Sequence, residues 1–138
     1  MTTTPATLDS PFRQAERTLR RPSSAVWLRT VRLHTARFDD ALEFYVTALG
    51  LTLGGVDVHP VTAATSARLL DAEGAAVFEL HDDPGGAAGA HEFAFAMPRR
   101  TVTLLRARLT SAGITATDCG PVLSFADPDG NRLRVEAM

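Results

Sequence analysis

Residues 31–51 read VRLHTARFDDALEFYVTALGL, and this stretch decides the fold. Apolar and polar residues alternate over its first five positions, as they do in a half-buried strand. Asp39 or Asp40 can then cap a helix whose apolar residues recur at three- and four-residue spacing. Gly50 follows the last apolar residue of that pattern and is suited to end the helix. The stretch therefore predicts a strand that leads into a helix packed against it.

Three further strands are expected after this helix, at residues 51–58, 66–71 and 75–81. Each is a short run of apolar and alternating residues bounded by turn residues. The next stretch, residues 82–90 (DDPGGAAGA), has the composition of a linker. The first strand, the helix and these three strands make a first unit of about residues 27–83.

The same order of elements begins again after the linker. Phe93, Phe95 and Met97 alternate with small or polar residues, and a helical pattern follows that ends at Gly113. Two shorter strands come next, and the turn sequence DPDGN at residues 127–131 joins them. This second unit covers about residues 90–138. The chain therefore contains an internal repeat, which is the feature that determines its architecture.

Pairing the two units buries the inner surfaces of both sheets and leaves a concave space between them. The predicted fold class is therefore α+β, with two tandem βαβββ modules that form a cupped mixed sheet. We expect these modules to make a single domain over residues 25–138. Residues 1–24 are expected to be an extension with a short helix, because a cap and a proline stand at residues 9–11 and Pro22 ends the helical pattern.

The composition fits a soluble globular protein, with 45% hydrophobic and 22% charged residues. A formal net charge of −2 gives no electrostatic reason to expect nucleic acid or a membrane surface as a partner. Cys119 is the only cysteine, so an intrachain disulfide cannot form, which fits a reducing compartment. Residues 1–8 lack an apolar signal core, and no apolar run approaches the roughly 20 residues that span a bilayer. We expect a cytoplasmic protein.

Two motifs of this repeat resemble a known family. FYVTALG at residues 44–50 is similar in identity and spacing to the first helix of the vicinal oxygen chelate superfamily of glyoxalases, bleomycin resistance proteins and dioxygenases. FADPDGNRLRVE at residues 125–136 resembles the closing hairpin of that superfamily, and Glu79 fits the end of its first module. The resemblance covers residues 27–138 and implies a small molecule bound in a cup of sheet. It does not specify a reaction, because this superfamily is chemically diverse.

In metal-dependent members of this superfamily, four cavity-facing residues hold a divalent ion, two from each module. The resemblance places those four positions at Thr30, Glu79, Glu92 and Arg134. Thr30 is a poor primary ligand, and Arg134 is a cation that would repel a divalent ion at short range. We therefore expect no bound metal and no other cofactor, and instead a charge-assisted network of two carboxylates and a guanidinium.

The register of the fifth strand leaves a metal-dependent alternative open. If Phe93 and the alternating apolar residues face the core, Glu92 faces the cup. A displacement by one residue would turn His91 into the cup instead. Glu79 and His91 would then be two credible ligands for a divalent metal, with His34 as a third.

Several strand residues are candidates for catalysis or for ligand binding. The candidate catalytic residues are Glu79, Glu92 and His34. The candidate ligand-binding residues are Thr30, Arg32, Arg134 and Phe93. A carboxylate without a charged partner could act as a base, and a histidine could exchange protons near neutral pH. Arginine offers a planar fork of donors that suits a carboxylate or phosphate on a ligand. For each residue, a solvent-facing position or a simple ion pair is the alternative.

The function ranked first is a metal-independent protein that binds a small organic molecule, as bleomycin-resistance-like members do. The alternatives are a metal-dependent lyase, isomerase or dioxygenase of the same superfamily, and a metal-free acid/base enzyme that uses the cavity carboxylates. A third reading is a regulatory module with a purely structural cup. A homodimer is expected to suit the exposed sheet edges of such modules. The sequence leaves open whether the protein is an enzyme.

Overall fold

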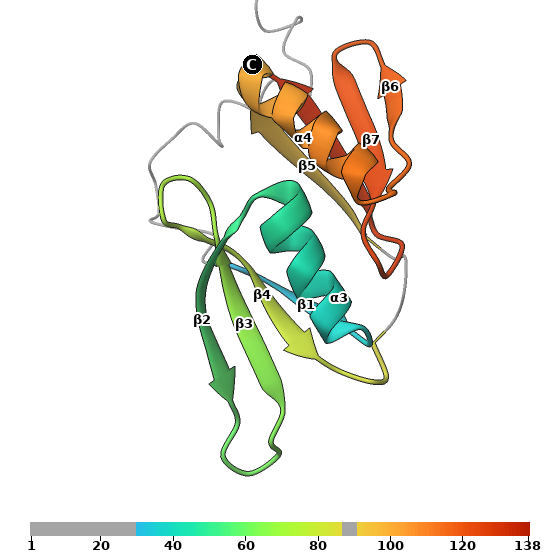
Figure 1. Cartoon of the computed structure of the whole chain (residues 1–138). Helices are drawn as coiled ribbons and strands as arrows, with labels where there is room; N and C mark the ends of the chain where they lie inside the picture. The colour runs from blue at the N-terminus through green and yellow to red at the C-terminus, as the bar shows by residue number, and fades with distance from the viewer. Residues whose placement is uncertain (1–29, 87–90) are drawn as a thin grey trace, which may run out of the picture.

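Two four-stranded mixed sheets, each with helix on one face, form the part of the chain that this computed structural model describes, residues 30–86 and 91–138 (Figure 1). The predicted extension at residues 1–24 and its short helix lie outside the described residues. None of the described helices has the length and apolar content that crossing a membrane requires.

The two sheets arise from two successive βαβββ units, as the repeat predicts. The first unit contains β1 (Val31–Thr35), α3 (Phe38–Glu43), η1 (Phe44–Leu49), β2 (Thr52–Val58), β3 (Thr65–Leu70) and β4 (Ala76–Asp82). The second unit contains β5 (Glu92–Met97), α4 (Arg99–Ser111), β6 (Thr117–Cys119), β7 (Val122–Ala126) and β8 (Arg132–Ala137). The sheet orders are β1-β4-β3-β2 and β5-β8-β7-β6, and the first pair in each sheet is parallel. The α+β prediction with tandem modules is confirmed.

The first helix contains a wide π-helical turn, which the sequence pattern did not predict. Residues 38–43 are α-helical, whereas residues 44–49 form η1. A wider turn places positions four and five residues apart on one face, and both FY at 44–45 and AL at 48–49 are buried. Gly50 ends the helix with a φ of 99°, and its N–H donates to the carbonyl of Tyr45. The predicted helix end at Gly50 is therefore confirmed.

Strand alternation gives each sheet a face toward its helix and a face away from it. In β1, Leu33 and Thr35 are buried, whereas Arg32 and His34 are exposed. In β8, Leu133 and Val135 are buried in the same way. We call the side away from the helix the open face. In the first sheet the open face carries Arg32, His34, Arg68, Glu79 and His81. In the second sheet it carries Glu92, Arg132, Arg134 and Glu136.

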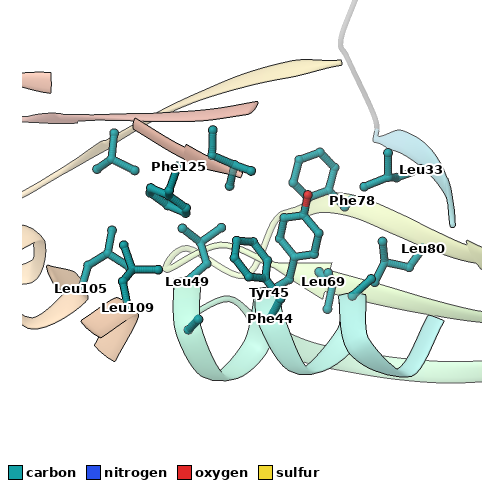
Figure 2. Packing of buried hydrophobic residues seen from close by; sticks show 14 of the residues in the cluster. Leu33, Phe44, Tyr45, Leu49, Leu69, Phe78, Leu80, Leu105, Leu109 and Phe125 are labelled. Atoms are coloured by element: carbon teal, nitrogen blue, oxygen red, sulfur yellow. The ribbon is translucent and has the colours of Figure 1, made fainter. Parts of the chain in front are cut away.

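One apolar core joins the two units (Figure 2). The ring of Phe78, on β4, lies 4.7 Å from that of Phe93, on β5. The ring of Phe44, on η1, lies 6.0 Å from that of Phe125, on β7. Burial of large aromatic side chains provides much of the stabilisation of a core of this size. The two modules are therefore held with their helix-side faces packed together.

A buried hydrogen bond adds a polar tie between the units. The hydroxyl of Tyr45 donates to Asp127 Oδ2 across 2.6 Å, and the whole tyrosine is buried. The other oxygen of Asp127 accepts the backbone N–H groups of Asp129 and Asn131. Backbone hydrogen bonds within the DPDGN turn therefore hold this carboxylate in place independently of the tyrosine. From α4, Arg108 donates its Nε to the carbonyl of Ala48 across 3.0 Å, which satisfies the end of η1.

The Tyr45→Phe substitution is expected to lower the free energy of unfolding by about 2 kcal/mol, because it removes a buried hydrogen bond to a charged group. Urea unfolding at pH 7 measures the change. Thr47→Val alters an exposed side chain of the same helix and serves as the control, with an expected change below about 0.5 kcal/mol. Equal losses in the two variants would contradict this role of the hydrogen bond.

The same hydrogen bond predicts a dependence of stability on alkaline pH. Burial, and then the hydrogen bond to Asp127, raise the pKa of Tyr45 well above its usual range. The folded state keeps this proton where the unfolded chain releases it. The contribution of this protonated hydroxyl to the free energy of unfolding is therefore fully present below a pH of about 10. Above that pH the free energy of unfolding falls by about 1.4 kcal/mol per pH unit. The chain has one Tyr and no Lys, so Tyr45→Phe should lack this loss. An equal alkaline loss in the variant would refute the assignment.

Candidate functional site

The open face of β1 and β4 carries a cluster of charged and imidazole side chains. These strands run parallel, with Arg32 opposite Glu79 and His34 opposite His81. Side chains directly opposite each other on one face lie close enough to interact. Accordingly, Arg32 Nε lies 3.3 Å from Glu79 Oε1, and His81 Nε2 lies 2.6 Å from the same oxygen. A single carboxylate oxygen of Glu79 therefore binds two basic groups.

A second carboxylate–imidazole pair stands next to the first. His34 Nδ1 lies 3.3 Å from Asp83 Oδ2, and the His34 ring stacks on that of His81 at 5.3 Å between centroids. The backbone N–H of Asp83 donates to the carbonyl of Thr35, which holds this residue at the end of β1. We call the set of Arg32, His34, Glu79, His81 and Asp83 the β1–β4 cluster.

The β1–β4 cluster has an inner and an outer part. The side chains of Glu79 and His81 are 24% and 26% exposed, whereas those of Arg32 and His34 are 69% and 52% exposed. Exposed ion pairs contribute little to stability. The Arg32 guanidinium and the His34 imidazole can therefore give up their present contacts with little loss of folding stability.

A polar pocket of about 290 Å³ opens beside the cluster, lined by Arg32, His34, Asp83, Gly85, Gly86 and His91. His91 stands directly before β5, and its ring stacks on Phe93 at 6.0 Å between centroids. The two modules therefore both contribute to this pocket. Three basic side chains, Arg32, His34 and His91, and one carboxylate, Asp83, line this pocket, whereas the N–H groups of Gly85 and Gly86 already donate to Asp83.

The register of β5 places Glu92, and not His91, on the open face of the second sheet. Phe93, Phe95 and Met97 pack against the core, as their alternation predicts. Glu92 Oε1 lies 3.8 Å from Arg134 Nη1, and both side chains are more than half exposed. This pair is the second group of charges that the two sheets present.

Thr30 and Phe93 lie at the seam between the modules. A cavity of about 400 Å³ there is lined by Thr30, Glu92 and Phe93 together with the rings of Phe78 and Phe95. The hydroxyl oxygen of Thr30 is buried and has no hydrogen-bond partner within the described part of the chain. The seam cavity is the more apolar of the two spaces, since three aromatic rings line it.

Three of the four positions that the resemblance implies form ion pairs, and these pairs belong to two different sheets. Glu79 belongs to the β1–β4 cluster, whereas Glu92 contacts Arg134 on the other sheet. Within residues 30–86 and 91–138, no ion pair or hydrogen bond connects Glu79 with Glu92 or Arg134. Glu79 therefore pairs with Arg32 and His81, and Glu92 pairs with Arg134; the expected single network stays a prediction.

These residues do not fit a metal centre of the kind that the superfamily implies. No three His, Cys, Asp or Glu side chains of the described residues are placed to share a metal ion. Glu79 is already bound to two basic groups, and Arg134 occupies a position where a metal site needs an acid. A cation at either place would have to displace or repel a guanidinium.

Two members of the cluster, His81 and Asp83, were not predicted from the sequence. His81 lies on β4, within the strand predicted at residues 75–81, but it was given no role in a site. The signal that could have found it is its spacing of two from Glu79, which puts both side chains on one face of a strand. Asp83 had no such signal, because it lies beyond the strand and reaches His34 only through the turn that follows.

Several solved structures share this architecture. A glyoxylase/bleomycin resistance protein/dioxygenase domain from Frankia sp. EAN1pec has a TM-score of 0.67 at 19% identity, covering 83% of this chain and 98% of its own. An antibiotic binding protein from Streptomyces sp. CB03234 has a TM-score of 0.63 at 20% identity, covering 83% and 97%. A fosfomycin resistance protein from Listeria monocytogenes, complexed with Mn(II) and dihydroxypropylphosphonic acid, has a TM-score of 0.66 at 14% identity, covering 83% and 93%.

No protein-family model and no curated protein sequence matches the chain. The three identities lie below 25%, so these structures establish a shared fold and no more. The resemblance that the two sequence motifs indicated is confirmed at the level of the fold.

The arrangement of the carboxylates predicts weak metal binding. Purified protein incubated with Mn(II), Ni(II) or Zn(II) and then freed of unbound metal is expected to hold a substoichiometric amount, measured by elemental analysis. Glu79→Gln and Glu43→Gln, a matched change on the exposed face of α3, should behave like the unmodified chain. One ion per chain that Glu79→Gln alone abolishes would show that Glu79 is a metal ligand.

Proposed function

The chain has the fold of the vicinal oxygen chelate superfamily, and on that premise we propose that it binds a small organic molecule without a metal ion. The observation that carries this proposal is the pairing of the carboxylates. Glu79 is bound by Arg32 and His81, and Glu92 lies beside Arg134. Carboxylates already neutralised by cations are poor metal ligands, whereas the same groups suit hydrogen bonding to an organic ligand.

The ligand that this face suits has at least one acidic group. The outermost groups of the β1–β4 cluster are the Arg32 guanidinium and the His34 imidazole, and His91 stands across the adjacent pocket. Arginine can hold a carboxylate or phosphonate with two parallel hydrogen bonds. A charge that remains partly solvated also avoids the large desolvation cost of a fully buried ion.

Proteins with this fold give independent support for a small organic ligand. The Streptomyces protein is an antibiotic binding protein, and the Listeria protein was crystallised with a phosphonic acid. The second of these also holds Mn(II), which keeps metal-dependent chemistry as the alternative that the metal-binding experiment addresses.

A thermal-shift screen of small carboxylates, phosphonates and antibiotics is expected to find a ligand that stabilises the protein, because binding to the native state alone raises its melting temperature. Arg32→Met should weaken the affinity for that ligand by about tenfold to a hundredfold, the usual effect of losing a charged hydrogen bond. Isothermal titration calorimetry measures the affinity.

Arg106→Met is the matched control. Arg106, on α4, pairs with Asp118, on β6, at an exposed place, and neither residue belongs to the β1–β4 cluster or to the Glu92–Arg134 pair. Its affinity should equal that of the unmodified chain. A screen without any stabilising compound would count against binding as the function, and equal affinities for Arg32→Met and Arg106→Met would remove the β1–β4 cluster from the site.

A metal-free acid/base enzyme is the second candidate, and the short contact between Glu79 and His81 favours it. An imidazole nitrogen 2.6 Å from a carboxylate oxygen is within hydrogen-bond distance, so a proton can pass between the two groups. For a carbonyl ligand found in the screen, deuterium exchange from D₂O at the adjacent carbon, followed by NMR, is expected to fall at least about a hundredfold in Glu79→Gln. Equal exchange in Glu79→Gln and Glu92→Gln would exclude this mechanism.

A further inference from the structure

Two spaces open along the seam between the modules, the polar pocket of about 290 Å³ and the seam cavity of about 400 Å³. On the β1 side, Arg32 lines the polar pocket, and Val31, the residue before it, lines the seam cavity. On the β5 side, His91 lines the polar pocket, and Glu92, the residue after it, lines the seam cavity. The two spaces are therefore neighbours on both sides of the seam.

A run of aromatic rings leads from the polar pocket to the seam cavity. The His91 ring stacks on that of Phe93 at 6.0 Å between centroids, and the Phe93 ring lies 4.7 Å from that of Phe78. The Phe78 ring lies in turn 6.0 Å from that of Phe95. Phe93 and Phe95 are only partly buried, and both line the seam cavity. This cavity therefore offers aromatic side chains against which a ring of a ligand can pack.

The charges that line the two spaces differ in sign. The polar pocket has three basic side chains and one carboxylate, which is already paired with His34. The charged side chains that line the seam cavity are Asp71 and Glu92, and both are acidic. Apart from these and Thr30, the lining of the seam cavity consists of alanine, valine and phenylalanine. An anionic group of a ligand is therefore favoured in the polar pocket and opposed in the seam cavity.

We infer that the ligand is an aromatic acid that spans both spaces, with its carboxylate or phosphonate in the polar pocket and its ring in the seam cavity. This inference rests on the proposed function, because it assigns the acidic group to the same guanidinium and imidazole groups. Val31 and His34 line different spaces and are three residues apart on β1, which corresponds to about 10 Å at the usual rise of a strand. The acidic group and the ring are therefore joined by a chain of several atoms.

Phenyl-substituted carboxylates of increasing chain length test this span. Phenylacetate, phenylbutyrate and phenylhexanoate share the acid and the ring and differ in the distance between them. Isothermal titration calorimetry of the full chain is expected to give an affinity at least about tenfold higher for phenylhexanoate than for phenylacetate, because only the longer chain lets the ring enter the seam cavity. Hexanoate, which has the same chain without the ring, should also bind at least about tenfold more weakly than phenylhexanoate.

Ala94→Trp tests where the ring binds. Ala94 is an exposed residue of β5 that lines the seam cavity, so a bulky side chain there takes up space that the ring needs. The affinity for phenylhexanoate should fall at least about tenfold, to that of hexanoate, whereas the affinity for hexanoate should not change. Ala96→Trp is the matched control, because Ala96 is exposed on the same face of β5 and lies outside the lining of the cavity.

The possible results separate this inference from the proposed function. Far-UV circular dichroism first checks that both tryptophan variants are folded. Equal affinities for phenylhexanoate and hexanoate, or equal losses in Ala94→Trp and Ala96→Trp, would overturn the aromatic acid and leave the proposed function intact. The same holds if none of these acids binds while another acidic ligand binds through Arg32. If no acidic compound binds at all, the proposed function itself fails.

Discussion

The relative placement of the two modules depends on the buried hydrogen bond between the Tyr45 hydroxyl and Asp127. The donor comes from the helix of the first module, and the acceptor from the turn before the last strand of the second. Because backbone N–H groups of the turn hold the carboxylate, the acceptor of the tyrosine hydroxyl has a defined position. The surrounding aromatic contacts then hold the helix-side faces of both sheets in one core.

Packing these faces together leaves the charged faces outward, and this separates the charges into two groups. The β1–β4 cluster contains two carboxylate–imidazole pairs and a guanidinium, whereas the second sheet contributes Glu92 and Arg134. Each carboxylate at a superfamily position is therefore balanced locally by a basic group. The same balance disfavours a divalent ion and provides donors for an acidic organic molecule. The chemistry of the open faces thus follows from which residues form ion pairs across neighbouring strands.

The strands and helices could be predicted because each depends on the spacing of apolar residues along a short stretch of the chain. The alternation of Phe93, Phe95 and Met97 correctly placed Glu92 on the opposite face of its strand. The strand β6 was not predicted, because residues 117–119 are polar, exposed and only three in number. Whether the four positions of the resemblance form one site depends on the angle between the modules. That angle is set by contacts between the modules, among them the Tyr45–Asp127 hydrogen bond and the packing of Phe78 against Phe93, which no pattern along the chain encodes.

If the chain binds its ligand without a metal ion, as we propose, binding must persist when metal is removed. Calorimetric titration of a stabilising ligand, first in buffer with excess EDTA and then in buffer with Mn(II) or Zn(II), tests it most directly. We expect the same affinity and stoichiometry in both buffers, because the proposed contacts to the ligand come from guanidinium and imidazole groups. Binding that disappears with EDTA and returns with the metal would contradict the proposal.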